Sequence, residues 1–242
     1  MKIKILTLFS LFAMTGCVQN TLVLDKQEKE KLTGKTITAI YQKHSYPHIN
    51  TPRVGMGIGL LGAGTGGIIG AVIGAEMVGG GEHINTLIIP ANYISEDIIS
   101  FLEKKYNMVR KEKSAMENSS PHKDHLDILS KEKKLSWLEK LEKEYSSDYI
   151  LDIHDTIWAV SYRMDWKFHI TYHYSLETDM QLIERESKKI VSQTSCQYSP
   201  KDDDKLPTYD EFFGNDAKLF KDENIKASDL CIQKIKSELF VD

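Results

Sequence analysis

The chain has 242 residues and carries 31 basic against 35 acidic side chains, a formal net charge of −4 at pH 7. Charges this close to balance exclude the broad basic surface typical of nucleic-acid-binding proteins. The length suits one large domain, or one domain with appendages. We therefore expect a single domain and no nucleic-acid partner.

The N-terminus has the parts of a secretory signal. Lys2 and Lys4 precede an apolar run, residues 5–14, which is too short to span a membrane. Cys17 directly follows Met-Thr-Gly, an arrangement that resembles a bacterial lipobox. The resemblance implies a signal peptide over residues 1–16, cleavage before Cys17, and acyl chains such as palmitate on Cys17. An ordinary signal peptide with an incidental cysteine is the alternative.

The residues after Cys17 indicate where the mature chain resides. Val18 follows the cysteine in place of aspartate, which in lipoproteins implies the outer rather than the inner membrane. Several acyl chains anchor a protein stably, because each buried methylene contributes about 0.8 kcal/mol. We expect a lipid-anchored chain that faces the periplasm. Residues 17–34 are largely polar, with KQEKEK in the middle, and predict a tether outside the core.

A glycine-rich segment, residues 54–81, follows the first predicted strand, residues 35–42. Twelve of the fifteen glycines lie in it. Four of them recur every fourth residue and would line one face of a helix, as in the small-xxx-small packing of membrane helices. The uncharged 22 residues from 54 to 75 would measure roughly 33 Å as a helix, enough to cross a bilayer. A glycine-rich connection between strand and helix is the alternative. The four glycines are Gly62, Gly66, Gly70 and Gly74.

The remaining chain predicts an α+β domain. Its strands form a small antiparallel β-meander packed against two or three helices, within one domain over residues 35–242. Residues 110–134 are polar and lysine-rich and predict a flexible insertion. Trp158, Trp166 and the tyrosines are expected to pack in the core or on a sheet face. The predicted helices span residues 90–106, 135–145 and 209–240, and the strands span residues 148–162, 167–184 and 189–198.

The cysteine count predicts one disulfide. With Cys17 acylated, Cys196 and Cys231 remain, and exported proteins meet oxidising conditions. A metal pair or a redox couple lacks the CxxC spacing and nearby ligands. A bridge across about 35 residues contributes on the order of 3–4 kcal/mol. It would join the last helix to the sheet.

No catalytic, metal or cofactor site is expected. The GxGxxG matches in the glycine-rich segment are separated from the preceding strand by Pro47 and Pro52, which argues against a dinucleotide site. His169 and His173 would lie about 13 Å apart on a strand, too far to share a metal. Asp152, His154 and Asp155 have no nearby serine or cysteine nucleophile that spacing identifies.

Three stretches resemble a family of uncharacterised proteobacterial outer-membrane lipoproteins. They are the glycine-rich run followed by IPANYISEDIISFLEKKYNM, the strand region DYILDIHDTIWAV…IVSQTSC, and PTYDEFFGNDAKLFKDENIKASDLC. The resemblance implies export, lipidation and an α/β domain with a cysteine pair, and it implies no activity.

We therefore expect a non-catalytic envelope lipoprotein with a structural, assembly or scaffolding role. The membrane is its partner through the acyl chains, and the glycine segment mediates self-association or membrane insertion. A homo-oligomer and a further envelope protein are the expected protein partners. The alternatives are a subunit of a secretion channel or pore, and an enzyme acting on envelope polymers or lipids, with a pocket near His154 and Asp152.

Overall fold

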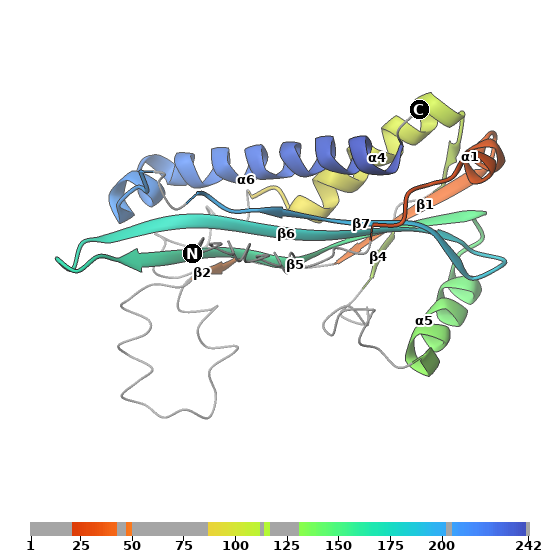
Figure 1. Ribbon diagram of the computed structural model, residues 1–242, viewed down its shortest axis with the longest axis horizontal. Coiled ribbons are helices and arrows are strands. Elements are labelled where there is room, and N and C mark those ends of the chain that lie inside the picture. The colour runs from red at the N-terminus through yellow and green to blue at the C-terminus, as the bar shows by residue number, and fades with distance from the viewer. Residues whose placement is uncertain are drawn as a thin grey trace, which may run out of the picture.

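The computed structural model of the protein describes residues 21–42, 47–49, 87–111, 114–116, 131–201 and 205–240. Within them, a mixed β-sheet is packed with helices (Figure 1), which confirms the α+β class. The helices are α1 (Lys26–Leu32), α4 (Pro90–Tyr106), α5 (Lys131–Glu144) and α6 (Tyr209–Leu239), and the strands are β1 (Thr36–Gln42), β2 (His48–Ile49), β3 (Val109–Arg110), β4 (Ser114–Met116), β5 (Tyr149–Met164), β6 (Ile170–Glu184) and β7 (Lys189–Tyr198).

The predicted β-meander forms the centre of the sheet. Strand β5 pairs antiparallel with β6, and β6 with β7, in the order β3-β1-β5-β6-β7. Strand β1 pairs parallel with β5, and β2 also pairs parallel with β5. The sheet is therefore mixed, with an antiparallel meander on one side and parallel pairs on the other.

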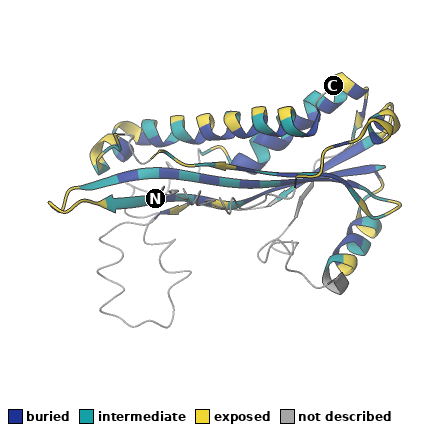
Figure 2. Ribbon diagram, viewed as in Figure 1, coloured by how far each residue is buried: buried dark blue, intermediate teal, exposed yellow. Residues whose placement is uncertain are grey.

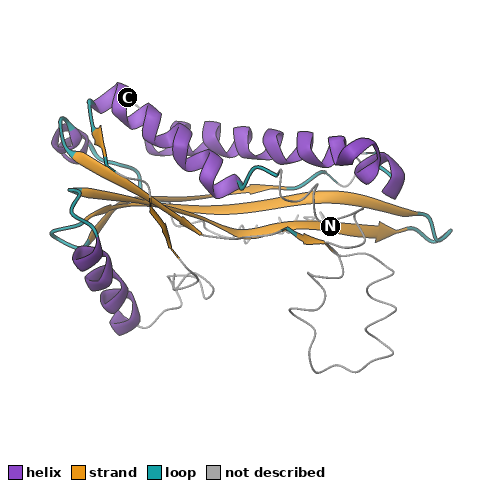
Figure 3. Ribbon diagram, turned by 180° about the vertical axis from the view of Figure 1, so that it is seen from behind, coloured by secondary structure: helices purple, strands orange, loops and turns teal. Residues whose placement is uncertain are grey.

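Two helices cover one face of this sheet and a third lies on the other. Helices α4 and α6 run along the same face, whereas α5 packs beneath one end (Figures 1 and 3). The larger hydrophobic core lies under α4 and α6, and a smaller one holds Ile40, Ile150 and Leu141 under α5. Because neighbouring strand residues point to opposite faces, Tyr149 and Leu151 lie in the first core while Ile150 lies in the second.

Helix α4 matches the predicted range. Pro90 stands at its first position, where the missing N–H costs nothing, and Ile94, Ile98 and Leu102 are fully buried at helical spacing. Helix α6 begins with a capping box between Thr208 and Glu211 and is broken over residues 214–217, where three non-glycine residues have positive φ. The single predicted helix is thus a short turn followed by a long helix.

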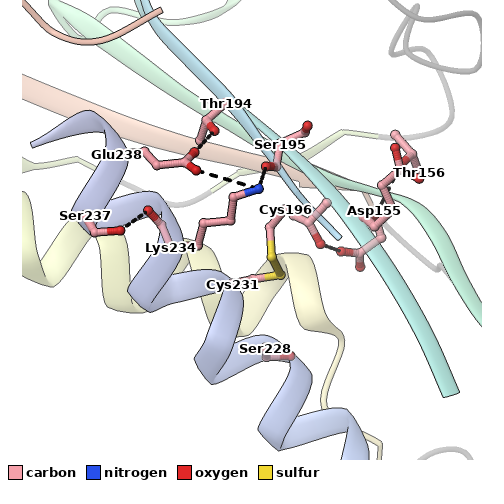
Figure 4. The surroundings of a disulfide bond; sticks show 12 residues. Asp155, Thr156, Thr194, Ser195, Cys196, Ser228, Cys231, Lys234, Ser237 and Glu238 are labelled. Carbon is pink, nitrogen blue, oxygen red and sulfur yellow. Dashed lines mark hydrogen bonds and ion pairs between the residues drawn. A yellow bond between two sulfur atoms is a disulfide. The ribbon is translucent and has the colours of Figure 1, made fainter. Parts of the chain in front are cut away.

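A disulfide joins Cys196 near the end of β7 to Cys231 in α6, with 5.3 Å between the Cα atoms (Figure 4). These are the two cysteines for which the cysteine count predicts a disulfide. Both residues lie in the larger core. Beside the bridge, the Lys234 ammonium donates to the carbonyl of Ser195 (3.0 Å), and the Thr194 hydroxyl donates to Glu238 (2.6 Å). The long part of α6 is therefore held to β7 by covalent and polar contacts together.

The expected tether is corrected over most of its length. Leu22 forms an antiparallel bridge with Gln193 on the outer edge of β7, through backbone bonds of 2.8 and 3.0 Å. Leu24 and Leu32 are buried in the larger core, and α1 connects them. The segment was expected to lie outside the core because most of its residues are polar. Its buried leucines nevertheless pack onto the sheet, so the average polarity of the segment does not predict where it lies.

A buried carboxylate fixes α1 in place. Glu28 accepts from Lys189 (2.9 Å) and from Lys31 (3.1 Å). The hydrogen bond from Lys189 lowers the pKa of Glu28, burial opposes this, and Lys31 adds to the lowering. Asp25 caps the helix by accepting from the Glu28 N–H (2.8 Å).

The other segment predictions fall partly or wholly outside the described residues. Cys17 and the four glycines, Gly62, Gly66, Gly70 and Gly74, lie outside them. Of the predicted insertion 110–134, the described parts belong to β3, to Lys111, to β4 and to the start of α5. Arg110 bonds to Glu96 and Glu103 of α4, so the insertion begins later than predicted.

We predict that the double variant Cys196→Ala/Cys231→Ala unfolds with a free energy about 3–4 kcal/mol lower than the parent. The reason is that the reduced chain regains the entropy of a loop of about 35 residues when it unfolds. Denaturant titration with and without a reductant measures the difference. The reductant should have no effect on the variant; equal stability of both proteins without reductant contradicts the prediction.

Candidate functional site

A buried aspartate lies where β5 changes its register. The pairing of β5 with β6 shifts between Asp155 and Ile157, so Thr156 is an extra residue, as in a β-bulge. Before the bulge, Leu151 and Ile153 face the larger core; after it, Trp158 and Val160 do. The bulge therefore moves the inward-facing positions from odd to even numbers.

Asp155 serves as the cap of α4 from outside the helix. Ile89, the N-cap residue of α4, makes no side-chain cap bond. The Ala91 N–H instead donates to Asp155 Oδ2 (3.0 Å), and the Thr178 hydroxyl lies 2.7 Å from Asp155 Oδ1. Both oxygens are satisfied, and the carboxyl group joins the helix to the sheet (Figure 4 shows Asp155 beside the disulfide).

Burial raises the pKa of Asp155 to about 7, and the bonds from Thr178 and Ala91 oppose this rise. Desolvation dominates because the group lies in an apolar core. When protonated, Oδ1 can donate to the Thr178 hydroxyl while Oδ2 still accepts from Ala91. The neutral form therefore fits this site without loss of a hydrogen bond.

A cleft of about 560 Å³ opens beyond the end of β7. Strand β6 continues past β7 here, and the chain before α6 covers its edge, with the Tyr172 N–H donating to the Pro207 carbonyl (2.8 Å). The rings of Tyr172, Tyr174 and Tyr198 line it together with titratable groups from β6, α6 and the connecting chain. These titratable groups are His173, Lys205, Glu211, Glu223 and Lys226.

The polar groups of the cleft bond mainly to one another. Glu223 accepts from the Tyr198 hydroxyl and from Lys226 (2.9 Å for the latter), and the Lys226 ammonium also lies 5.5 Å from the centre of the Tyr198 ring. Burial, followed by the bond to Glu223, raises the pKa of Tyr198. Tyr174 donates to Asn224 (2.6 Å), and Asn224 donates to the Ile88 carbonyl (2.7 Å). These bonds hold α6 and the start of α4 on the sheet.

His173 is the cleft histidine whose Nδ1 has no hydrogen-bond partner in the structure. Burial lowers its pKa, and Arg163 adds to the effect. A neutral imidazole results. His169 precedes β6 and bonds to Asp165 (3.0 Å), so the two histidines do not share a site.

Asp152 and His154 lie on the sheet face opposite α4 and α6. Both are buried, and His154 Nε2 lies 3.8 Å from Asp179 Oδ2 on β6. Gln181 of the same face donates to Gln193 (3.4 Å). The cleft described above is not lined by either residue. Among the described residues, no group of three or more acidic, histidine or cysteine side chains is arranged to hold a metal ion.

The tip of the β5–β6 hairpin overturns one expectation. Trp158 is buried as predicted, but Trp166 is 83% exposed and Phe168 is 78% exposed. The hairpin extends past the other elements at one end of the molecule (Figure 2). Trp166 has no packing layer to join there, because the helices and β7 end before it. Nothing in the alternation of residues 163–170 reveals where the supporting layers stop.

The sequence matches no family model and no curated protein. Comparison with solved structures finds matches at low identity. The dodecameric PelC from Paraburkholderia phytofirmans is 11% identical, over 86% of this chain and 90% of its own, with a TM-score of 0.31. A Xanthomonas campestris protein of the family DUF330 is 9% identical, over 84% of each chain, with a TM-score of 0.34.

A third structure is the lipoprotein GNA1162 from Neisseria meningitidis. It is 11% identical, over 79% of this chain and 99% of its own, with a TM-score of 0.26. All three scores lie below 0.5.

We predict that Asp155→Asn flattens the pH dependence of stability. The folded state binds a proton on Asp155 up to about pH 7, whereas the unfolded state releases it near its ordinary pKa of 3.8. Stability from this group is therefore complete below about pH 4 and is lost as the pH rises through 7, by on the order of a few kcal/mol.

Asparagine mimics the neutral acid, since it can accept from Ala91 and donate to Thr178. Denaturant titrations at pH 5 and pH 8 should differ less for the variant than for the parent. Glu211→Gln, at the exposed capping box, provides a control that leaves Asp155 intact. An unchanged difference between the two pH values in Asp155→Asn contradicts the assignment.

Proposed function

We propose that the chain is a non-catalytic outer-membrane lipoprotein that faces the periplasm and serves as a structural or interaction component of the envelope. The observation that carries this proposal is the docked N-terminal segment, residues 21–35, directly after the lipobox-like sequence. Leu22 bonds to β7 and Leu24 is buried, so four residues, 18–21, separate the acylated position from Leu22.

The short connection determines which part of the domain meets the membrane. Four residues reach at most about 14 Å, even fully extended. Acyl chains on Cys17 would hold the outer edge of β7 close to the lipid headgroups. The domain would then be positioned by its anchor rather than suspended from a long tether.

The glycine-rich segment favours association over a single crossing of the bilayer. The same domain holds both of its ends: Ile49 pairs with Val160 on β5, and the Ile88 carbonyl accepts from Asn224 of α6. A single crossing would leave the ends on opposite sides of the membrane. We propose that Gly62, Gly66, Gly70 and Gly74 support packing between copies, or a shallow insertion that returns to the same side. No helix among the described residues is long and apolar enough to cross a membrane.

A non-catalytic role also agrees with the bonding in the cleft. An enzyme needs an acid, base or nucleophile available to a substrate. In the described cleft, Glu223, Tyr198 and Lys226 bond to one another, and Glu211 caps α6. The Nδ1 of His173 has no hydrogen-bond partner, but this atom is buried and so is not presented to a substrate. Neither Asp152 nor His154, near which an enzymatic pocket was the alternative expectation, lines this cleft.

We predict that Cys17→Ser moves the protein from the outer-membrane fraction to the soluble fraction of the cell. The substitution removes the acylated thiol and leaves the described domain unchanged. Fractionation, with mass spectrometry of the purified N-terminus, measures both location and acylation. Cys231→Ala serves as a control that should stay membrane-bound. An unmodified N-terminus in the parent, or membrane residence of Cys17→Ser, refutes the anchor.

We predict that Gly66→Leu/Gly70→Leu reduces self-association of the acylated protein in mild detergent. Leucine side chains would prevent the close approach that a bare helix face allows. Mass photometry reports the oligomer size, and circular dichroism checks that the domain remains folded. Ile68→Leu is the matched control, since it changes the same segment without filling the glycine face. The same oligomer size in the parent and the double variant would count against packing through these glycines.

A further inference from the structure

Among the described residues, the tip of the β5–β6 hairpin gathers three exposed apolar side chains that the proposed function does not use. We name it the aromatic tip and define it as residues 163–169. Residues 164–169 are all exposed, and Met164 joins Trp166 and Phe168 in presenting apolar surface. Figure 2 shows the tip as an exposed end beyond the helix layer. Scattered single apolar residues need no explanation, but three within five positions at a protruding end do.

Hydrogen bonds close the turn that carries the two exposed aromatic rings. Asp165 accepts from the Lys167 N–H (2.7 Å) and the His169 N–H (2.9 Å), and its second oxygen lies 3.0 Å from His169 Nδ1. The Asp165 N–H donates to the His169 carbonyl (3.0 Å), and the Phe168 N–H donates to the Asp165 carbonyl (3.0 Å). The polar groups of the turn are thus largely satisfied within it.

Phe168 adopts a backbone conformation that its side chain does not favour. Its φ is +62°, in the left-handed region where glycine and asparagine are the usual residues. A turn selected only for stability would carry one of those residues. Strained positions of this kind cluster at functional sites, and here the cost places a phenyl ring at the outermost end of the hairpin.

Basic side chains flank the aromatic rings. The Lys167 ammonium lies 4.8 Å from the centre of the Trp166 ring, and Arg163 precedes the turn. Tryptophan and phenylalanine beside lysine and arginine suit the membrane–water interface, where rings enter the headgroup region and cations meet anionic lipid. A protein partner would more often be met by a broader apolar patch with a polar rim.

We infer that the aromatic tip enters the headgroup region of the same bilayer that holds the acylated N-terminus. This inference rests on the proposed function for the anchor. Two rings bind a bilayer weakly by themselves, but the anchor keeps the domain at the surface and makes the second contact intramolecular. The tip therefore orients the domain rather than attaching it.

The distances allow both contacts on one surface. Leu22 pairs with Gln193, which lies opposite Gln181 on β6. The eleven steps along the strand from Gln181 to Ile170 span roughly 36 Å, at about 3.3 Å each. The anchor and the tip are thus separated along the long axis of the sheet. Both reach one bilayer when this axis lies nearly parallel to the membrane.

The test uses the acylated full-length chain in liposomes of phosphatidylethanolamine and phosphatidylglycerol at a ratio of 3:1, with or without brominated acyl chains. Trp137 and Trp158 are buried, so Trp166 supplies the lipid-sensitive tryptophan emission. We expect this emission to shift to shorter wavelength and to be quenched by bromine. Trp166→Phe isolates the signal, because the emission that remains in that variant comes from the buried pair.

The variant Phe168→Asn/Met164→Ser keeps Trp166 as the reporter, and asparagine tolerates the positive φ at position 168. We expect it to reduce the quenching at least twofold. The control Leu230→Ser, at an exposed leucine on α6, should leave it unchanged. Equal quenching in the tip variant and the parent overturns the inference. So does a solvent-exposed Trp166 in the parent, which would leave the tip as a protein contact.

Two further arms separate the possible sources of failure. In the first, light scattering reports vesicle clustering; clustering would mean that the tip reaches a second bilayer, which overturns the single-bilayer arrangement. In the second, the unacylated Cys17→Ser chain is titrated with the same vesicles. Trp166→Ser/Phe168→Asn should lower its partition about tenfold. This arm tests the tip even where mass spectrometry finds no acyl chain on the parent. Equal partition of both unacylated proteins overturns the inference.

Discussion

The antiparallel pairing of β5 with β6 is the interaction on which the other elements depend. It extends from Tyr149 opposite Glu184 to Met164 opposite Ile170, and β1 and β7 attach to its two outer edges. Helices α4 and α6 lie on the face that this pair provides (Figure 3). Since β1 and β7 are shorter, the pair continues past them at one end of the sheet, where β2 and the chain before α6 border only part of it. The cleft and the aromatic tip both follow from that difference in length.

The bulge at Thr156 shows how one added residue serves two layers. Without this extra residue, Asp155 and Trp158 would face opposite sides of the sheet. Either Asp155 could then no longer cap α4, or the Trp158 indole would leave the larger core. The cap carries a cost, because a carboxyl group is buried where desolvation raises its pKa to about 7. Two hydrogen bonds to the carboxyl group and the binding of a proton offset this desolvation cost. No neighbouring positive charge is required.

The elements were largely predictable from local pattern, because each strand and helix has enough residues for its own period to stand out. Helix 90–106 is found at its predicted bounds, and the three meander strands lie within a few residues of theirs. The burial of Ile157 is not predictable from local pattern. An isoleucine in an apolar strand is expected in the core, but Ile157 is 42% exposed. The bulge that exposes it depends on the register with β6, which no local period encodes.

The candidate sites were less predictable, for a related reason. The docking of residues 21–35 depends on Leu22, Leu24 and Leu32. Their neighbours are charged, so the composition of the whole segment does not reveal these three leucines. Trp166 was expected to pack because most tryptophans do, but packing needs a neighbouring layer, and the length of β7 and α6 decides where that layer ends. Asp155 offered no sequence signal, since its partner Ala91 is 64 positions away.

In the proposed arrangement, the docked segment and the aromatic tip together would restrict the orientation of the domain at a membrane. A single anchor followed by a long tether would leave the domain free to rotate. Here the connection is at most four residues, and Leu22 fixes its start on the β7 edge. The proposed second contact, at the far end of the β5–β6 pair, would remove the remaining rotation about the anchor. The opposite sheet face, with Asp152, His154 and Gln181, and the helix face then keep defined directions relative to the bilayer. A defined orientation of this kind is what repeated packing between neighbouring copies on one membrane requires.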